Sequence, residues 1–244
     1  MRLKDKVCVI TGSAQGIGEA IAGGYAEEGA KVVIADLPCQ MEQAQKVAKE
    51  IGSELVLEID IRDRTSISNC FAKAAEHFGH IDVLVNNAGI NRTNDFDKQT
   101  EQEWNEVIDV DLTGVFRCCQ EVLPHIADNG RIINIASLSA HTGGPRSPAY
   151  AAAKMGVIAL THNVARFLAP RGICVNALSP GVIGNEFTEI TMAPEVKKWN
   201  MERILLKRFA DAKEMVGAAI FLASDESRYY TAQTMSVNGG AWVH

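Results

Sequence analysis

Seven short apolar runs recur along the chain, and longer stretches with helical spacing separate them. Each run is long enough for one strand, and most are rich in β-branched residues: 7–10, 31–35, 55–59, 83–85, 132–135, 174–178 and 235–237. Between them, apolar residues stand three or four positions apart, as at Ile17, Ala20 and Ile21. Strands that are apolar on both faces and alternate with helices form a parallel sheet that helices cover. The pattern predicts an α/β fold with one domain over residues 1–244, a doubly wound seven-stranded parallel sheet with helices on both faces.

The composition is that of an acidic globular protein with enough apolar residues for a large core. Hydrophobic residues make up 47% of the 244, and the formal net charge is −6. An acidic chain lacks the basic face that general nucleic-acid binding requires. No apolar run reaches the length of a bilayer-spanning helix, and the N-terminus leads into the first predicted strand without a signal peptide. We therefore expect a cytoplasmic protein that binds neither nucleic acid nor membrane.

Neither the cysteines nor the histidines are spaced as metal ligands. The six cysteines contain no CxxC pair, and the six histidines contain no HExxH motif. Cys8 and Cys174 lie inside apolar runs, where a small hydrophobic thiol is an ordinary core residue. We predict neither a disulfide framework nor a metal site.

One segment, residues 183–208, interrupts the alternation of strands and helices. Its apolar residues are in amphipathic order, as Phe187, Trp199 and Ile204 illustrate. The segment begins just beyond the carboxyl end of a predicted strand, where open α/β sheets bind ligands. It is either a substrate-binding lid or an ordinary packed helical excursion, and the apolar spacing does not separate the two.

A glycine-rich segment, TGSAQGIG at residues 11–18, follows the first predicted strand and opens the first predicted helix. Glycines permit positive φ and close approach to a pyrophosphate, while a helix N-terminus turns N–H groups toward the anion. A tight strand–helix turn also uses glycine, but an acidic residue ends the next strand, as in dinucleotide-binding Rossmann folds. We predict cofactor contacts at Gly12, Gln15, Gly16, Ile17 and Gly18.

That acidic residue, Asp36, indicates which dinucleotide binds. A carboxylate there accepts hydrogen bonds from the adenosine ribose hydroxyls and repels a 2′-phosphate. Its neighbours Gln15 and Leu37 are neutral, and no Arg or Lys is obviously placed to meet that phosphate. The sequence predicts NAD in preference to NADP, with contacts at Asp36 and Leu37. A solvated turn residue is the weaker interpretation of Asp36.

Polar residues also end the third and fourth predicted strands, on the same edge of the sheet. Their side chains can contact the cofactor or tie strand ends together. Cofactor contact is the better interpretation for Asn87 and Gly89, whereas architectural bonding is nearly as good for Asn86 and Asp60. We predict contacts at Asp60, Ile61, Asn87, Ala88 and Gly89.

Tyr150 and Lys154 stand four residues apart in AYAAAK, so a helix places both side chains on one face. A free tyrosine titrates at about pH 10 and needs a nearby positive charge to act as a base at neutrality. The Lys154 ammonium and an oxidised nicotinamide could supply that charge. Ser137, just past the fifth predicted strand, could hydrogen-bond the substrate oxygen. Such a pair alone is usually structural, but after a dinucleotide turn and a strand-end serine it predicts a catalytic site.

The chain resembles a classical short-chain dehydrogenase/reductase over essentially its full length. The matching motifs are TGxxxGxG at 11–18, NNAG at 86–89, a serine thirteen residues before YxxxK, Pro-Gly at 180–181 and NGG at 238–240. The resemblance implies proton transfer by Tyr150, ribose binding and tyrosine activation by Lys154, and substrate positioning by Ser137.

The resemblance also implies that the backbone at Pro180, Gly181, Val182 and Ile183 binds the nicotinamide end of the cofactor. We expect substrate contacts at Ser137, Ser139, Tyr150 and Phe187. Members of the family are commonly tetramers, packed through helices that here span roughly 101–125 and 148–169. This resemblance and the apolar breadth of residues 151–168 predict a homotetramer.

Two positions depart from the family pattern. Asp111 replaces the usual Asn, which joins a water-borne proton relay to the lysine. We count Asp111 as catalytic and expect the relay to survive through a backbone carbonyl, exposed where the helix is locally disturbed. The alternative is that Asp111 points away and bonds neighbouring backbone. Asn185 stands where the family favours Thr, which leaves one cofactor contact open.

The resulting prediction is an NAD-dependent oxidoreductase that moves a hydride between NAD(H) and a secondary alcohol or ketone. The alternative is a 3-oxoacyl thioester reductase, acting on a carrier-protein or coenzyme A thioester, which the sequence also resembles. Such reductases usually prefer NADP and present basic residues to an acidic carrier, whereas here only Arg131 and Arg171 lie near residues 125–129. A non-catalytic dinucleotide-binding regulator is a third interpretation, against which the presence of both Tyr150 and Lys154 counts.

Overall fold

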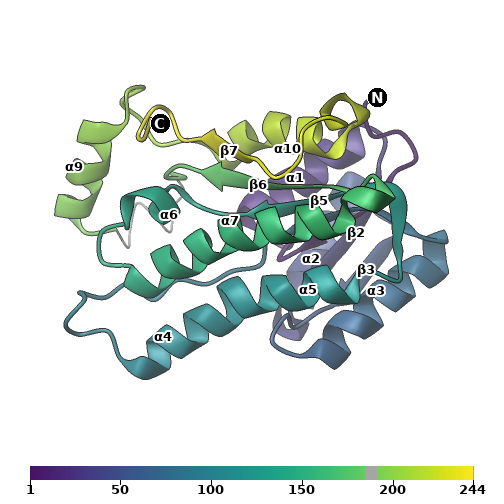
Figure 1. The fold of residues 1–244 in the computed structure, drawn as a ribbon, viewed down its shortest axis with the longest axis horizontal. Coiled ribbons are helices and arrows are strands. Elements are labelled where there is room, and N and C mark those ends of the chain that lie inside the picture. Colours follow the sequence, from purple (N-terminus) through teal and green to yellow (C-terminus); the bar gives the residue numbers. More distant parts are fainter. Residues whose placement is uncertain (185–191, 244) are drawn as a thin grey trace.

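The structure is a computed structural model that describes residues 1–184 and 192–243. Within these residues, a seven-stranded parallel sheet has the order β3-β2-β1-β4-β5-β6-β7, with helices on both faces (Figure 1). The strands are β1 Val7–Thr11, β2 Lys31–Asp36, β3 Leu55–Glu58, β4 Ile81–Asn86, β5 Ile126–Ile135, β6 Cys174–Pro180 and β7 Thr234–Val237. Each predicted apolar run has become a strand, which confirms the predicted single doubly wound domain.

The main difference from the prediction concerns β5, which begins at Ile126 instead of residue 132. Its pairing with β4 shifts register between Ile81 and Val83, and residues 127–130 lie at this irregularity. Those residues read ADNG and contain no large apolar side chain. An apolar run therefore marks only the regular, buried part of the strand.

Two groups of helices cover the two faces of the sheet. On one face lie α1 Gly16–Glu27, α2 Met41–Ile51 and α10 Val216–Ala223; on the other lie α3 Arg64–Phe78, α5 Val115–Glu121 and α7 Pro148–Leu168. Alternate strand residues point to opposite faces of the sheet. Val9 and Leu84 pack against α3, α5 and α7, whereas Ile10 and Val85 pack against α1, α2 and α10. This explains why the strands read as continuous apolar runs.

The strand order reverses between β1 and β4, which lie side by side although β2 and β3 separate them in sequence. Connections from these two strands leave in opposite directions, so a crevice opens at their carboxyl ends. Thr11 ends β1 and Asn86 ends β4 at this place. Figure 1 shows α6 Leu138–Thr142, α9 Pro194–Arg203 and the start of α7 gathered at the same end of the sheet.

The described part of segment 183–208 contains a short parallel bridge and one helix. Ile183 pairs with Ala210, and α9 follows from Pro194 to Arg203. Phe187 lies outside the described residues. None of the helices in residues 1–184 and 192–243 has both the length and the apolar character needed to cross a bilayer.

Candidate active site

Tyr150 and Lys154 lie on the first turns of α7. Pro148 occupies the first turn, where its fixed φ suits a helix and its missing N–H costs no hydrogen bond. The alanines that follow favour the helix, and the four-residue spacing places both functional side chains on one face. The Lys154 Nζ lies 5.4 Å from the centroid of the Tyr150 ring. Lys154 is 2% exposed and Tyr150 is partly buried.

Asp111 lies in a π-helical turn, Asp109–Gly114, which joins α4 Glu101–Ile108 to α5. Its side chain is fully buried, and Oδ1 accepts the N–H of Ile90 at 2.8 Å. Oδ2 lies 3.1 Å from the Lys154 Nζ in an ion pair. Asp111 therefore faces the lysine, and the interpretation in which it points away is wrong. The π turn is the local disturbance of the helix that the sequence analysis expected.

Lys154 is held as a buried ammonium. Its Nζ donates to the carbonyl of Ile135 at 3.1 Å and forms the ion pair with Asp111. Burial lowers the pKa of Lys154, but the Asp111 carboxylate and the Tyr150 side chain together raise it by more, so the pKa lies above its usual value. The ammonium consequently keeps its charge throughout the neutral range.

Ser137 follows β5 and is the N-cap of α6. Its Oγ accepts the N–H of Ser139 at 3.1 Å, which fixes the serine at the start of the helix. An acceptor role leaves the hydroxyl proton of Ser137 able to donate to another oxygen. The serine thus combines a local structural role with a free donor.

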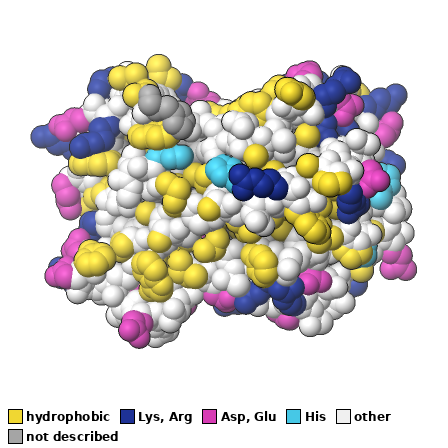
Figure 2. Space-filling view, viewed as in Figure 1, with side chains coloured by type: hydrophobic (Ala, Val, Ile, Leu, Met, Phe, Trp, Pro, Cys, Tyr) yellow, Lys and Arg dark blue, Asp and Glu magenta, His cyan; other side chains and the backbone are white. Residues whose placement is uncertain are grey.

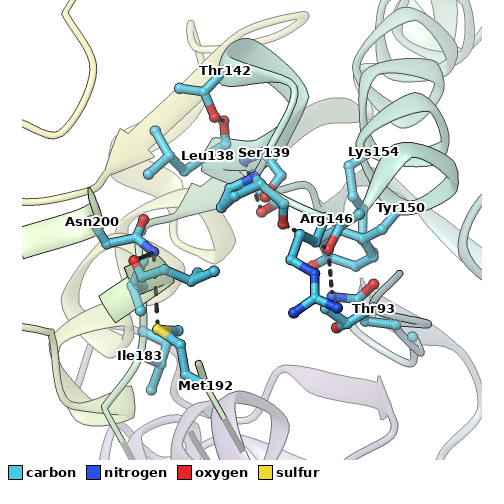
Figure 3. Close-up of a pocket in the computed structure, with 18 of the residues that line it drawn as sticks. Thr93, Leu138, Ser139, Thr142, Arg146, Tyr150, Lys154, Ile183, Met192 and Asn200 are labelled. Atoms are coloured by element: carbon cyan, nitrogen blue, oxygen red, sulfur yellow. Dashed lines mark hydrogen bonds between the residues drawn. The ribbon is translucent and has the colours of Figure 1, made fainter. Parts of the chain in front are cut away.

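These side chains line one cavity of about 570 Å³, which we call the Tyr150 cavity. In Figure 3, Lys154, Tyr150, Arg146 and Thr93 lie on one side of it and Asn200, Ile183 and Met192 on the other. Its lining includes Ile17, Asn87, Gly89, Ile90, Asp111, Ser137, Ser139, Arg146, Tyr150, Lys154, Gly181, Val182, Ile183, Met192, Val196, Trp199 and Asn200.

A second cavity of about 520 Å³, the Asp36 cavity, lies over the ends of β1, β2 and β4. Its lining includes Gly12, Gln15, Ile17, Asp36, Leu37, Gln40, Asp60, Ile61, Arg62, Asn87, Ala88, Gly89, Ile90, Arg92 and Val110. Four residues line both cavities: Ile17, Asn87, Gly89 and Ile90. The two cavities therefore meet beside the N-terminus of α1, and together they form one elongated cleft.

The glycine turn is shaped by close backbone packing. Gly12 has φ +65°, and a Cβ there would lie 2.8 Å from the Cα of Ala88. A Cβ on Gly18 would overlap the carbonyl oxygen of Gly12. The Asn87 amide donates to the carbonyls of Thr11, at 3.0 Å, and Gly12, at 2.8 Å. Asn87 thus ties β4 to the turn as well as lining both cavities.

Asp36 is also part of this turn. One carboxylate oxygen accepts the N–H of Ala14 and the other accepts that of Leu37, each at 2.8 Å. The side chain is 8% exposed but still lines the Asp36 cavity. The carboxylate therefore holds the glycine turn against β2 and places a negative charge at the cavity wall.

The comparisons with known proteins agree with this geometry. A family model described as "Enoyl-(Acyl carrier protein) reductase" matches residues 12–241. The chain is 39% identical to the 3-oxoacyl-[acyl-carrier-protein] reductase FabG of Staphylococcus aureus strain Mu50 over 244 residues, which is 98% of each chain. It is 40% identical to FabG of Thermotoga maritima, over 98% of this chain and 99% of the relative, and 35% identical to that of Escherichia coli K12, over 100% of both.

Among solved structures, a short-chain dehydrogenase/reductase from Brucella melitensis, titled a glucose/ribitol dehydrogenase, superposes with a TM-score of 0.93. The identity is 31%, and the match covers 100% of this chain and 99% of that one. This chain belongs to the short-chain dehydrogenase/reductase family. It is accordingly an oxidoreductase with a Rossmann-like fold.

Most of the cofactor contacts that the sequence and the family resemblance predicted line the cleft. The exceptions are Gly16, Gly18 and Pro180, which line neither cavity. Gly181, Val182 and Ile183 line the Tyr150 cavity, as do the predicted substrate contacts Ser137, Ser139 and Tyr150. Their contacts with cofactor and substrate stay predictions.

Sequence reasoning missed two arginines in the wall of the Asp36 cavity, Arg62 and Arg92. Arg62 bonds Asp60 through Nη2 at 2.6 Å and through Nε, and this bond lowers the pKa of Asp60. The Nε of Arg92 lies 3.2 Å from a carboxylate oxygen of Glu106. Arg62 follows the end of β3 and could have been found from that position, whereas Arg92 lies in a loop with no signal of its own.

Sequence reasoning also missed polar side chains around the substrate side of the Tyr150 cavity. Arg146 and Thr93 come from loops, and Asn200 comes from α9. Trp199 of the same helix was already among the apolar residues of the predicted segment 183–208. Within residues 1–184 and 192–243, no three His, Cys, Asp or Glu side chains are clustered as metal ligands.

Proposed function

We propose that this short-chain dehydrogenase/reductase moves a hydride between NAD(H) and a secondary alcohol or ketone, with Tyr150 as general acid and base. One observation carries the proposal: Tyr150, Lys154 and Ser137 line the cavity that joins the Asp36 cavity beside the glycine turn. A dinucleotide laid along this cleft brings its two ends to the two cavities.

The residues present fit a dinucleotide. The glycine turn packs so closely that a Cβ at Gly12 would meet Ala88, and α1 presents its N-terminus beside it. Such a turn suits a pyrophosphate, because its N–H groups and the helix dipole favour an anion. Asp36 lies toward the adenosine end, and Val182 and Ile183 lie toward the nicotinamide end. When bound, the nicotinamide supplies the hydride-accepting carbon.

Tyr150, Ser137 and Lys154 have different roles in the proton transfer. In alcohol oxidation, the Tyr150 oxygen takes the hydroxyl proton as the carbinol hydride leaves; in ketone reduction, it returns that proton. The Ser137 hydroxyl donates to the substrate oxygen, because accepting the Ser139 N–H leaves the hydroxyl proton free. The Lys154 ammonium stabilises the phenolate and is kept charged by Asp111. The proposed relay to water starts at the Lys154 ammonium, whose partners are the Ile135 carbonyl and the Asp111 carboxylate.

NAD should be preferred over NADP by at least about tenfold in kcat/KM, because a 2′-phosphate would meet the Asp36 carboxylate. The guanidinium groups of Arg62 and Arg92 already pair with Asp60 and Glu106. Steady-state kinetics with both cofactors measures the preference. Asp36→Asn removes the charge while leaving an oxygen for one backbone N–H. It should lower the ratio of kcat/KM with NAD to kcat/KM with NADP. Equal efficiencies in the unmodified enzyme, or a preference for NADP, would contradict the assignment.

The second candidate substrate is a 3-oxoacyl thioester, which the names of the curated relatives favour. Two arginines are relevant to a carrier protein as the bearer of that thioester. Arg131 is 3% exposed and bonds the carbonyls of Gly130 and Ser224. Arg171 pairs with Asp128 at 2.8 Å and donates to two backbone carbonyls. Arg131 is therefore unavailable to an acidic partner, whereas the Arg171 side chain is 37% exposed, so we retain both a carrier-protein and a coenzyme A thioester as forms of the second candidate.

A substrate panel tests the proposal. Polyols, hydroxy acids, cyclic alcohols and acetoacetyl thioesters are mixed with NAD or NADH, and the change in NADH is followed. We expect turnover of at least one secondary alcohol–ketone pair. Efficient reduction of the thioester alone would select the second candidate. Binding of the dinucleotide without turnover of any compound would instead indicate a regulator.

We propose segment 183–208 as the substrate-binding part of the domain. Its helix α9 contributes Val196, Trp199 and Asn200 to the Tyr150 cavity, and Met192 precedes it. A helical segment with a purely structural role, the alternative interpretation, would not need to line this cavity. The segment therefore supplies a largely apolar wall opposite the Tyr150 side.

The protein should be a homotetramer with dihedral symmetry. Large apolar side chains are exposed on α4, α5 and α7: Trp104, Phe116, Met155 and Phe167. Figure 2 shows hydrophobic side chains spread over the face these helices form. Packing of this face on other copies would bury them. Sedimentation equilibrium at micromolar concentration should give four times the chain mass of 26.4 kDa; a monomer would contradict the prediction.

A further inference from the structure

The Tyr150 cavity contains a cation that the proton chemistry does not use. Arg146 lies in its wall, in the loop between α6 and α7, on the same side as Tyr150 and Thr93 in Figure 3. Its backbone has φ +57°, in the left-handed region that non-glycine residues adopt rarely and at a cost. A strained residue in a ligand cavity is a candidate for a functional role.

The neighbouring loop fixes Arg146 but does not use all its donors. The Arg146 Nε lies 2.9 Å from a carboxylate oxygen of Asp95, and the Arg146 carbonyl accepts the N–H of Asn94 at 2.8 Å. Asp95 is shared, because Lys98 pairs with it at 3.2 Å. Within the described residues, the structure gives the two terminal nitrogens of Arg146 no acceptor. A guanidinium presents five N–H donors in a planar fork that matches a carboxylate.

Charge balance favours an anion at this place. Three charged residues are among the described lining of the Tyr150 cavity, and two of them, Asp111 and Lys154, neutralise each other at 3.1 Å. Arg146 pairs with Asp95, but Asp95 also pairs with Lys98, so these three side chains leave one positive charge at the cavity wall, although the whole chain carries −6. The opposite wall is largely apolar, with Ile183, Met192 and Trp199. The cavity thus combines one cation with a hydrocarbon-binding surface.

We propose that Arg146 binds the carboxylate of the substrate, so that the enzyme acts on hydroxy or keto acids with an apolar body. This inference rests on the proposed hydride transfer at Tyr150, and it names the class of alcohol that reacts there. The overall step is oxidation of the carbinol carbon by NAD, which becomes NADH, with release of one proton. The carboxylate stays unchanged and serves only in binding.

Kinetics on matched pairs tests the proposal. The 2-, 3- and 4-hydroxy derivatives of medium-chain carboxylic acids are each compared with their methyl esters, which lack the charge. In the unmodified enzyme, at least one acid should exceed its ester by about tenfold or more in kcat/KM, the scale of a charge-assisted hydrogen bond. Arg146→Gln should bring the ratio of kcat/KM for the acid to kcat/KM for its ester near one, chiefly by raising the KM for the acid. Arg146→Lys should retain part of the preference for the acid.

Arg64→Gln is the matched control, because Arg64 is also a partly exposed, ion-paired arginine but lies outside the cavity. It should leave the ratio unchanged. Esters that react as well as the acids would overturn the role of Arg146 while leaving the proposed function intact. A ratio that survives Arg146→Gln would overturn it as well.

A binding measurement keeps the inference testable if no alcohol is turned over. Calorimetry compares 4-phenylbutyrate with 4-phenylbutyramide, in the presence of NAD. The carboxylate should bind at least about tenfold tighter than the amide, and Arg146→Gln should abolish the difference. Equal affinities in the unmodified protein would refute the carboxylate site. Selective binding without turnover would instead retain the site and refute the proposed catalysis.

Discussion

Tyr150→Phe is expected to lower kcat by about a hundredfold or more, the usual contribution of a positioned general acid or base. The change deletes only the hydroxyl that carries the transferred proton. The ring keeps its place on α7 and its contact with the Lys154 ammonium, 5.4 Å from the ring centroid. NAD affinity should therefore stay within a few-fold, since Asp36 and the glycine turn are untouched. Steady-state turnover and dinucleotide titration measure the two quantities.

Tyr229→Phe provides the control for this experiment. Tyr229 is 99% exposed and lies far along the chain, between α10 and β7, so loss of its hydroxyl should change neither turnover nor binding. If Tyr150→Phe kept most of its turnover, the active site would have to lie elsewhere. If it lost NAD binding together with turnover, the effect would be structural instead of chemical.

Lys154→Met should abolish most turnover and lower the free energy of unfolding by about 3–5 kcal/mol, the cost of leaving a buried charge without its partner. Asp111 is fully buried, and after the change the Ile90 N–H would be the one hydrogen-bond donor left to its carboxylate among residues 1–184 and 192–243. The phenolate of Tyr150 would also lose its stabilising ammonium. Denaturant unfolding and steady-state kinetics measure the two losses.

The double variant Asp111→Asn, Lys154→Met separates stability from chemistry. It removes both charges and keeps an amide oxygen for Ile90, so much of the lost stability should return while turnover stays low. Asp111→Asn alone should keep the enzyme active and shift the pH profile of kcat modestly. A collapse like that of Tyr150→Phe would show that the carboxylate itself is indispensable.

The pH dependence of the stability loss follows from the pKa of Lys154. Because the folded-state pKa is raised, the contribution of the ion pair is fully present below the ordinary lysine value of 10.5 and is lost as pH rises through the raised value. The difference between unmodified enzyme and Lys154→Met should therefore be constant across the neutral range. A difference that faded near pH 7 would contradict a buried, charged Lys154.

The elements that carry local patterns were predictable from the sequence. Apolar runs gave the strands, and the glycine turn with Asp36 gave the edge at which the cleft opens. The four-residue spacing of Tyr150 and Lys154 placed both on one helix face. Each of these signals is contained in one segment or in strand ends that a parallel sheet must bring together.

Contacts between distant segments were not predictable in the same way. The 3.1 Å approach of Asp111 to Lys154 depends on how the π turn packs against α7. Arg146 and Arg92 enter the cavities from loops, whose paths have no sequence periodicity that would predict them. Asp36 was expected to serve the cofactor, but its bonds to Ala14 and Leu37 depend on the folded turn. Tertiary packing decides such side-chain positions.

Isotope transfer tests the central claim most directly. NADH deuterated at C4 of the nicotinamide, one face at a time, is incubated with the enzyme and the ketone that the panel identifies as substrate. With one of the two labelled forms, the alcohol product should carry one deuterium on its carbinol carbon, and Tyr150→Phe should slow its formation by about a hundredfold or more. Alcohol without label from either form, or no transfer to any ketone of the panel, would contradict hydride transfer at this site.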